Sequence, residues 1–472
     1  MANEYLKFPT EEAQARLERY KYNDLLFEGR HFDAFSVKIK DPRYNRDYYA
    51  LKYIVGNFAG LISKVCADML FGEPASFSVD KGDQGWLEDL IFENQLHTQN
   101  YESALANSRH GDAVFKIRSG LLNPGDKDMT VIIEDISPQI YFPVLNSSNI
   151  RERPRQQELC WKVSISGKEY LRKEIHEPGL IRNELWLLDG DKVTVEVDIK
   201  LFDSTLLPTQ KTNIERSLVV HVPNWRDGSR YFGYDDYSDL NSLFYGLNNR
   251  MTKTENILDK HSDPILALPE GVLDEEGNVK KEAFNMFEIP TGVGANPAKP
   301  EYITWNASLE SSFKQIDKIT ELLYQFSETS PDVFGMGDNK AESGKALKLR
   351  MMRTIAKVSR KKLYYSHALK EVLFVAQEFA RANKLKVRGN LIKKESIIPE
   401  IVWSDGLPID DRETLENEQL RLEAGLTTLQ DSLIRLDGLD EETAKKKVIE
   451  IQSENTVSIP STVPKMSDEE ST

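Results

Sequence analysis

Residues 236–261 read DYSDLNSLFYGLNNRMTKTENILDKH, and this stretch decides how the rest of the chain is organised. Apolar side chains recur along it mostly three or four positions apart, which is the period of one face of an α-helix. At 1.5 Å per residue the stretch predicts a helix of about 39 Å. Its apolar residues are Leu240, Leu243, Phe244, Leu247, Met251 and Leu258.

A second amphipathic helix is predicted over 309–326, where Leu309, Phe313, Ile316, Ile319, Leu323 and Phe326 keep the same register. Between the two helices lies a segment rich in Gly, Pro and short β-like runs, from Asp263-Pro264 to Asn306. Two helices that bracket a small module predict an antiparallel stalk that carries this module.

The part of the chain before residue 236 divides into a helical and a β-rich region. Helices are predicted over 10–27, 48–71 and 86–105, with stops at Gly29, Gly72 and Gly111. Asp189-Gly190-Asp191 is typical of a hairpin turn. The β-rich runs lack the βαβ alternation of a nucleotide-binding fold, so we expect a mixed or antiparallel sheet. The predicted strands are 113–117, 130–133, 139–145, 158–165, 184–188, 192–198 and 218–222.

The part after residue 330 is predicted to be mainly helical. Residues 331–342, PDVFGMGDNKAE, interrupt the helical pattern, and a long helix is expected over 343–384. A charged helical region follows over 410–452, split at Gly425 and Gly438. Residues 456–472 read as a flexible acidic tail.

Composition limits the classes of function. The chain has 472 residues with 61 Lys and Arg against 76 Asp and Glu, a net charge of -15, which argues against tight, charge-driven binding to nucleic acid. The two cysteines, Cys66 and Cys160, suit a reducing compartment and are expected to be buried. We expect no signal peptide at the N-terminus and no membrane partner, since no stretch has the apolar length of a span.

Motifs for catalysis are weak. No GxxxxGK[ST] sequence occurs, so we expect no ATPase site. Paired Asp235 and Asp236 are compatible with a two-metal site, but Asp236 or Ser238 also stands where a helix N-cap is expected, which is the favoured interpretation. His110-Gly111-Asp112 and His261-Ser262-Asp263 are more typical of turn or core residues than of ligands. We expect neither a metal nor another cofactor.

The start of the long helix is strongly basic. Residues 343–362 hold eight Lys and Arg and no acid. Such a face is either solvated or contacts anions, namely phosphates or the acidic groups of a neighbouring subunit. Because like charges repel at i,i+4 spacing, the run suggests an external anionic partner. The cations that share one broad face are Arg350, Arg353, Lys357, Arg360 and Lys361.

The order of these features resembles that of the portal proteins of tailed bacteriophages, in the branch typified by siphophages of Gram-positive bacteria. The resemblance covers residues 20–455 and depends on several short matches taken together. They are NFA at 57–59 through FGEP at 71–74, ISPQ at 136–139 with FPV at 142–144, KEIH at 173–176, YDDYSD at 234–239, ILDKHSDP at 257–264 and ESGKAL at 342–347.

The resemblance implies an α+β, portal-type fold with a mixed α/β wing, a two-helix stem, a small β/loop clip, a long wing helix and an α-helical crown. It places the parts on this sequence as follows: wing 1–235, stem helix 236–263, clip 264–308, stem helix 309–330, tunnel loop 331–342, long wing helix and return 343–404, crown 405–455 and tail 456–472.

The resemblance also implies a function that is structural and not enzymatic. The chain would form a ring, expected to be a dodecamer, at one capsid vertex of the virion after assembly in the host cytoplasm. Double-stranded DNA would pass through the ring during packaging and ejection. The partners implied are the terminase large subunit, the scaffolding and major capsid proteins, and a head-completion or adaptor protein. The alternative is a metal-dependent nucleic-acid enzyme that uses Asp235 and Asp236.

Candidate functional residues follow from that placement. The basic face of Arg350, Arg353, Lys357, Arg360 and Lys361 is expected to contact a second subunit or the capsid side in preference to DNA. Candidates to face DNA in the tunnel loop are Val333, Phe334, Gly335, Met336, Gly337, Asp338, Asn339 and Lys340. Candidates to face the bore from the stem are Asn241, Asn248, Lys253, Asn256 and Lys260.

Overall fold

The computed structural model describes residues 7–36, 52–126, 128–261, 265–269, 286–289, 301–303, 309–336, 344–404, 411–439 and 441–457. The chain forms two compact units. Unit 1 comprises residues 1–339 and 349–406, and unit 2 comprises residues 340–348 and 407–472. Helices and sheets are both present, so the α+β class is confirmed.

Unit 1 begins with helices, as predicted. They are α1 (Glu11–Phe27), α2 (His31–Phe35), α4 (Phe58–Phe71), α5 (Gln84–Glu93) and α6 (Leu96–His110). Thr10 caps α1 by accepting from the Ala13 N–H. The prediction of one continuous helix over 48–71 is wrong, because residues 53–57 are not helical and Asn57 caps α4 by accepting from the Gly60 N–H at 2.9 Å. Residues 48–51 lie outside the described part of the chain.

The single helix predicted over 86–105 is two helices, with a break at Asn94 and Gln95. The Asn94 side chain accepts from the Ile133 N–H at 2.7 Å and donates to the Val131 carbonyl at 3.2 Å. Gln95 adopts a left-handed backbone with φ of 47°. The break lets Asn94 bond the backbone of a strand that lies far away in sequence.

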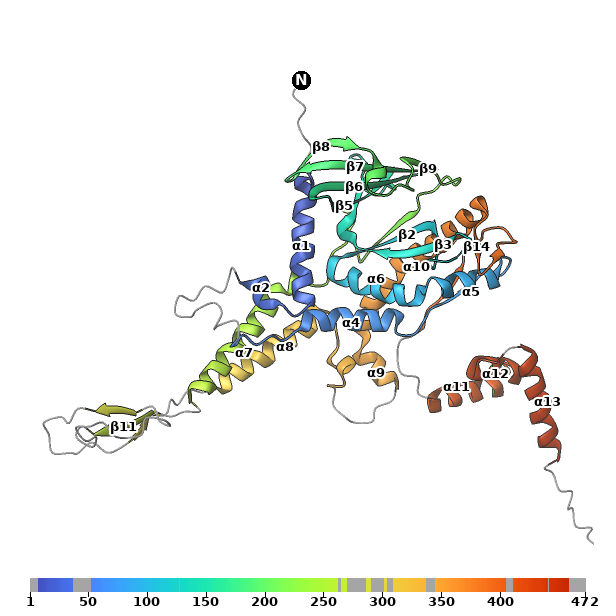
Figure 1. Cartoon of the computed structure of the whole chain (residues 1–472). Helices are drawn as coiled ribbons and strands as arrows, with labels where there is room; N and C mark the ends of the chain where they lie inside the picture. The colour runs from blue at the N-terminus through green and yellow to red at the C-terminus, as the bar shows by residue number, and fades with distance from the viewer. Residues whose placement is uncertain are drawn as a thin grey trace, which may run out of the picture. The chain divides into compact units, whose positions relative to one another are not determined.

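Two antiparallel sheets follow in unit 1 (Figure 1). One has the order β10-β2-β3 and is contacted by α6 and α10. The other has the order β4-β5-β6-β7-β8, with β9 paired to β7. The hairpin at 189–191 is confirmed, since Asp189 pairs with Lys192. The bounds are β2 (Asp112–Gly120), β3 (Thr130–Ile136), β4 (Tyr141–Val144), β5 (Gln156–Ile165), β6 (Lys168–Glu177), β7 (Leu180–Asp189), β8 (Lys192–Val197), β9 (Thr209–Lys211) and β10 (Val219–Pro223). Short 3-10 turns span η1 (Pro138–Ile140) and η2 (Ile199–Leu201).

Strand β6 was not predicted, although it pairs with β5 and β7 along its whole length. Its buried side chains include Arg172, Glu174 and His176, so its inward face is charged. Glu174 accepts from Lys116 and His176, and Arg172 donates to the Asn183 side chain. A strand that buries ion pairs does not show the apolar alternation on which the prediction depends.

The stalk is present as two helices, α7 (Asn241–His261) and α8 (Glu310–Phe326), which lie side by side (Figure 1). A 3-10 turn, η3 (Ser238–Leu240), precedes α7. One apolar cluster anchors both helices to α1, α2 and α4, and Phe244, Leu247 and Leu323 belong to it. The segment between the helices forms a small sheet of β11 (Ile265–Pro269), β12 (Met286–Ile289) and β13 (Glu301–Ile303), with β11 parallel to β12 and antiparallel to β13.

The long helix predicted over 343–384 is interrupted at Met351, which separates α9 (Gly344–Arg350) from α10 (Met352–Asn383). Beyond α10 come the short hairpin β14 (Lys386–Val387) and β15 (Asn390–Leu391), and β16 (Glu400–Val402), which pairs with β1 (Ser76–Ser78). In unit 2, α11 (Asp411–Glu423), α12 (Leu429–Asp437) and α13 (Glu441–Val457) confirm the helical region split at Gly425 and Gly438. The tail from residue 458 lies outside the described residues. Within the described residues, no helix is long and apolar enough to cross a bilayer.

Candidate functional site

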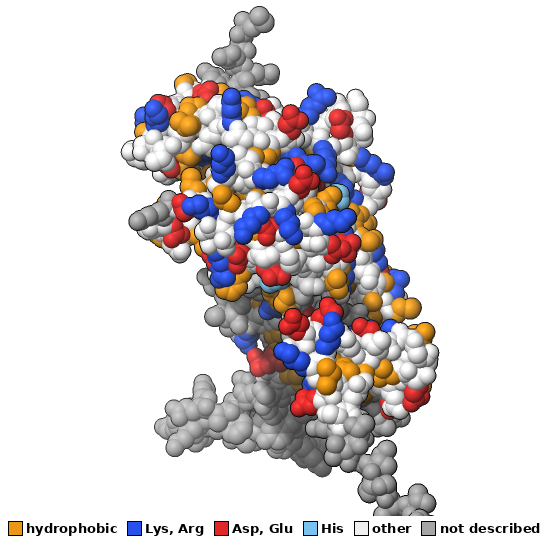
Figure 2. All heavy atoms as spheres, turned by 90° about the vertical axis from the view of Figure 1, so that its right-hand side faces the viewer, with side chains coloured by type: hydrophobic (Ala, Val, Ile, Leu, Met, Phe, Trp, Pro, Cys, Tyr) orange, Lys and Arg blue, Asp and Glu red, His pale blue; other side chains and the backbone are white. Residues whose placement is uncertain are grey.

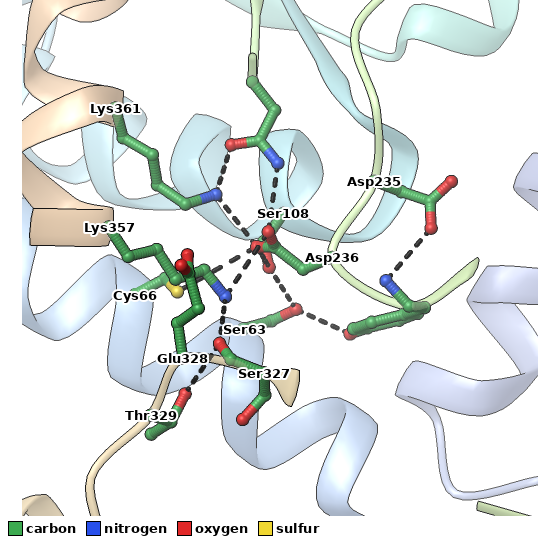
Figure 3. A network of polar contacts seen from close by, with 12 residues as sticks. Ser63, Cys66, Ser108, Asp235, Asp236, Ser327, Glu328, Thr329, Lys357 and Lys361 are labelled. Carbon is green, nitrogen blue, oxygen red and sulfur yellow. Dashed lines mark hydrogen bonds and ion pairs between the residues drawn. The ribbon is translucent and has the colours of Figure 1, made fainter. Parts of the chain in front are cut away.

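Besides single residues of α4 and α6 and Asn224, three segments of unit 1 meet in one network of polar contacts (Figure 3). They are the residues that lead into α7, the residues that follow α8, and the first half of α10. One helix therefore contacts the chain both where it enters the stalk and where it leaves it.

Asp236 is the centre of the network. Its carboxylate lies 2.8 Å from Lys361 Nζ and 3.4 Å from Lys357 Nζ, and it accepts from the Ser108 hydroxyl at 2.6 Å. Asn224 donates to it at 3.2 Å and accepts from Lys361. Burial alone would raise the pKa of Asp236, but Lys357 and Lys361 outweigh burial and hold that pKa far below its ordinary range.

The expectation that Asp236 or Ser238 is the N-cap is wrong, because Tyr237 occupies the N-cap position of η3 and the N–H groups there bond to Asp235. The Asp235 carboxylate accepts from the backbone N–H groups of Tyr237 and Ser238 at 3.0 and 2.7 Å. It also lies 3.3 Å from the guanidinium of Arg19. Two adjacent acids thus have separate tasks, because one satisfies the free N–H groups before α7 and the other pairs with α10.

The segment after α8 is fixed to α10 by several contacts. Lys357 Nζ donates to the Ser327 carbonyl at 3.0 Å, and the Ser330 N–H donates to Thr354 Oγ1 at 2.8 Å. Glu328, which has a positive φ of 56°, pairs with Arg353 and Arg360. Burial would lower the pKa of Lys357, but Asp236 and the other acids nearby raise it, so Lys357 stays charged.

The basic face therefore has acidic partners within this chain. This corrects the argument for an external anionic partner, which assumed that the face had none. Lys357 and Lys361 are buried, with 7% and 3% of their side chains exposed, and both contact Asp236. Arg350 lies 3.3 Å from Asp332. The acids come from segments that are distant in sequence, so the local absence of acids was misleading. Arg353 and Arg360 keep exposed fractions of 73% and 49% and share Glu328, and their contact with a second subunit stays a prediction.

The first residues of the segment 331–342 form a 3-10 turn, η4 (Pro331–Phe334). Gly335 follows in the left-handed region with φ of 68°. Phe334 packs on Tyr324 of α8, whose hydroxyl donates to Met336 Sδ at 3.1 Å. Met336 is 68% exposed, and Val333 is partly exposed. Gly337, Asp338, Asn339 and Lys340 lie outside the described residues.

The stem candidates differ in exposure. Asn248 is fully buried, accepts from the Gly56 N–H at 2.9 Å and bonds the ring of His31, so its assignment to the bore is wrong. Lys253 is exposed, whereas Asn241 and Asn256 are partly exposed. The side chain of Lys260 lies outside the described residues. The role of the other four stays a prediction.

The partners that complete the network were not predicted from the sequence; they are Ser108, Asn224, Ser327, Glu328 and Thr354. The spacing along the helix does indicate that the two lysines are buried. Lys357 and Lys361 lie three or four positions from Thr354, Val358 and Tyr365, which are buried on the same face. No local pattern marks Asn224 or Glu328.

The geometry does not favour a two-metal site at the paired acids. Asp236 already contacts two ammonium groups, and Asp235 accepts from backbone N–H groups. Among the described side chains, no three His, Cys, Asp or Glu residues are placed to hold a metal ion. His110 is a core residue, as expected, and bonds Asp24 at 2.8 Å, while Cys66 and Cys160 are both buried.

Comparison with known proteins gives a family match in sequence and likenesses among solved structures. Residues 209–458 match the family described as "Phage portal protein, SPP1 Gp6-like". No curated protein matches the chain in sequence. A chain of a solved particle described as "Virion of native gene transfer agent (GTA) particle" is similar over 93% of this chain and 96% of its own length, with 11% identity and a TM-score of 0.45. Because the family match covers more than half of the residues, including the whole stalk and α10, this chain belongs to the SPP1 Gp6-like family of phage portal proteins.

Proposed function

We propose that the chain is a subunit of a dodecameric ring at one capsid vertex and a conduit for double-stranded DNA during packaging and ejection. The proposal rests on the family and on one observation, that α10 holds the chain where it enters and where it leaves the two-helix stalk, through Asp236 and the segment 327–332. A channel through which DNA is driven needs such rigid connections between its body and its stem. We place the phage in the siphophage branch of Gram-positive hosts and ring assembly in the host cytoplasm.

The parts of the subunit are assigned by the order of the elements. Residues 1–235 and the long helix with its return, 343–404, form the wing, and 236–263 with 309–330 form the stem. The insertion 264–308 is the clip, which docks the terminase large subunit and later the head-completion or adaptor protein. Residues 405–455 form the crown and 456–472 the tail. Scaffolding and major capsid proteins contact the ring from the shell.

The proposed function is structural. ATP hydrolysis is assigned to the separate terminase, because the chain has no P-loop sequence. The net charge of -15 per subunit makes the average field of a ring repel DNA, so the duplex passes without adhering.

Residues 331–342 are proposed to be the tunnel loop that faces DNA. Its base is fixed at Ser330 and Asp332, whereas Gly335 has a left-handed backbone that suits a flexible glycine. Deletion of residues 335–339 should leave ring assembly intact and shorten or destabilise the packaged DNA. Full-length packaging with normal retention would contradict this role.

The ring is tested by imaging the purified protein along its symmetry axis, with native mass spectrometry to count subunits. A closed ring with an axial hole is expected. A monomer with metal-dependent nuclease activity would instead support the alternative based on Asp235 and Asp236.

The exposed arginines give a test of subunit contact. Arg353 and Arg360 share one glutamate, so they leave positive charge for an acid of the neighbouring copy. The double variant Arg353→Glu, Arg360→Glu should form fewer closed rings than the control Lys370→Glu, which lies farther along α10. If the double variant and the control form rings in equal yield, the two arginines contact Glu328 and no second subunit.

A further inference from the structure

Unit 2 leaves most of its large apolar side chains at the surface. Its helices α11, α12 and α13 have 13, 9 and 17 residues. Among the described residues of unit 2, Ala444 is the one apolar side chain that is buried. Helices this short gain most of their stability from packing on an apolar surface, so unit 2 needs a partner that supplies one. Its exposed large apolar residues are Leu415, Leu420, Leu426, Leu436 and Ile449.

The outward side of α11 places a leucine between two acids. Glu418 marks the inward side, because it is buried and accepts from the Ser432 hydroxyl of α12 at 3.0 Å. At 3.6 residues per turn, Glu416, Leu420 and Glu423 lie about 140° to 160° around the helix from Glu418. Leu420 is 61% exposed, and both glutamates are exposed. We call these three residues the acidic face.

The outward side of α13 places an isoleucine beside two lysines. Ala444 is fully buried and marks the side on which α13 packs in unit 2, where it contacts α12. Lys445, Lys446 and Ile449 lie about 100° to 160° around the helix from Ala444. Ile449 is 65% exposed, and both lysines are exposed, although Lys445 also pairs with Glu441 of its own helix. We call Lys445, Lys446 and Ile449 the lysine face.

The acidic face and the lysine face do not meet within one copy. Helix α12 contacts α11 through Ser432, and it contacts α13 through the pair of Asp437 with Lys447 at 2.8 Å. Figure 1 shows α12 between α11 and α13, and both faces point away from α12. Figure 2, in which the α13 side of Figure 1 faces the viewer, shows apolar side chains at the surface among charged ones.

We propose that the acidic face of one copy binds the lysine face of the next copy, so that the units 2 form a closed row around the ring. The proposal rests on the proposed function, because a ring gives every copy one neighbour on each side. A contact between two different faces of the same chain repeats from copy to copy until the ring closes. Leu420 and Ile449 then cover each other, and the glutamates meet the lysines around them.

A second copy is the occupant that satisfies both faces. An acidic protein of the shell would bind the lysine face and leave Leu420 exposed, whereas a basic one would leave Ile449 exposed. DNA phosphates would be repelled by Glu416 and Glu423 and would leave both apolar side chains in water. Two-fold pairing of like faces would bring acids against acids or lysines against lysines.

Cysteine cross-linking in the assembled ring tests the contact directly. Leu420→Cys with Ile449→Cys, in the full chain under a mild oxidant, should give a ladder of covalent oligomers that extends beyond the dimer. Each single variant is a control and should give monomers, because the native Cys66 and Cys160 are buried. Dimers from a single variant would show two-fold pairing and overturn the proposal. Monomers alone from the double variant in intact rings would overturn it as well.

Charge reversal gives a second test that does not depend on cysteine geometry. Variant A carries Glu416→Lys and Glu423→Lys, and variant B carries Lys445→Glu and Lys446→Glu. Each variant alone brings like charges together, so its yield of closed rings should fall about tenfold relative to the wild type. A mixture of A and B should recover the rings, with the two variants alternating, because each reversed face then meets a face of opposite charge.

The outcomes separate this proposal from the proposed function. The matched controls, which should form rings as the wild type does, are Lys168→Glu and Glu169→Lys, exposed residues of the large sheet in unit 1. If A and B each form rings in wild-type yield, or if their mixture recovers none, the proposal is wrong while the wild type still forms rings. If the wild type itself forms no ring, the proposed function is wrong.

Discussion

Lys361 Nζ lies 2.8 Å from Asp236 Oδ2, and only 3% and 5% of the two side chains are exposed. The pair connects α10 to the residue that leads into the first stem helix. A buried charge pair of this kind adds little net stability, but loss of one partner is costly because the other remains charged and desolvated.

Asp236→Asn should therefore destabilise unit 1 strongly, by about 3 to 5 kcal/mol, because it leaves Lys357 and Lys361 without a counter-ion. Adding Lys357→Met to this variant should recover part of the loss, since one unpaired charge is removed. Urea unfolding measures both effects, and Asp239→Asn, an exposed acid of η3, is the control. If the losses in unfolding free energy from the two substitutions simply add in the double variant, Asp236 and Lys357 are not coupled.

The pH dependence of stability should report the same carboxylate. The pKa of Asp236 is lowered in the folded protein relative to about 3.9 in the unfolded chain, so the unfolded chain binds more protons below that value. The stabilisation is complete above about pH 5 and is lost as the pH falls. The difference in urea midpoint between wild type and Asp236→Asn should shrink from pH 7 to pH 3. A constant difference would contradict the assignment.

Asp135 of β3 should behave in the opposite way. Burial, with a smaller contribution from Glu102, raises the pKa of Asp135 to about 7, and Asp135 Oδ1 has no hydrogen-bond partner. Folding then favours the protonated acid, so stability falls as the pH rises from about 4 to 7. Asp135→Asn should raise the urea midpoint at pH 8 and have little effect at pH 4, with a gain of up to ~4 kcal/mol. If the exposed control Asp80→Asn changes the urea midpoint by the same amount, burial of Asp135 is not the cause.

Gly111 lies where its backbone closely approaches residues 233–235, which lead to Asp236. Its φ is 87°, and an added Cβ would lie 2.7 Å from the Gly233 carbonyl oxygen and 2.9 Å from the Asp235 nitrogen. Gly111→Ala should cost more than about 1 kcal/mol, because the clash adds to left-handed strain. Gly85→Ala, in α5 with open space around it, should be neutral or stabilising. Thermal unfolding compares the two, and equal melting temperatures would contradict the prediction.

Elements that bury an apolar stripe were predictable from local sequence. Side-chain periodicity predicts the stalk helices and α1. Turn residues predict the splits at Gly425 and Gly438 and the hairpin at 189–191. The breaks at Asn94 and before Phe58 were not predictable, since each depends on a bond with a distant segment. Strand β6 was missed because its buried side chains are charged.

By itself the sequence determined the order of the parts, the family resemblance and a net charge unsuited to tight binding of DNA. Tertiary structure alone decided what the basic helix contacts. Lys357 and Lys361 are neutralised by Asp236, 121 and 125 positions away along the chain, and Arg353 by Glu328, 25 positions away, and only folding brings these acids within reach. The physical reason is that Coulomb interaction depends on distance in space, whereas a sequence pattern records only distance along the chain.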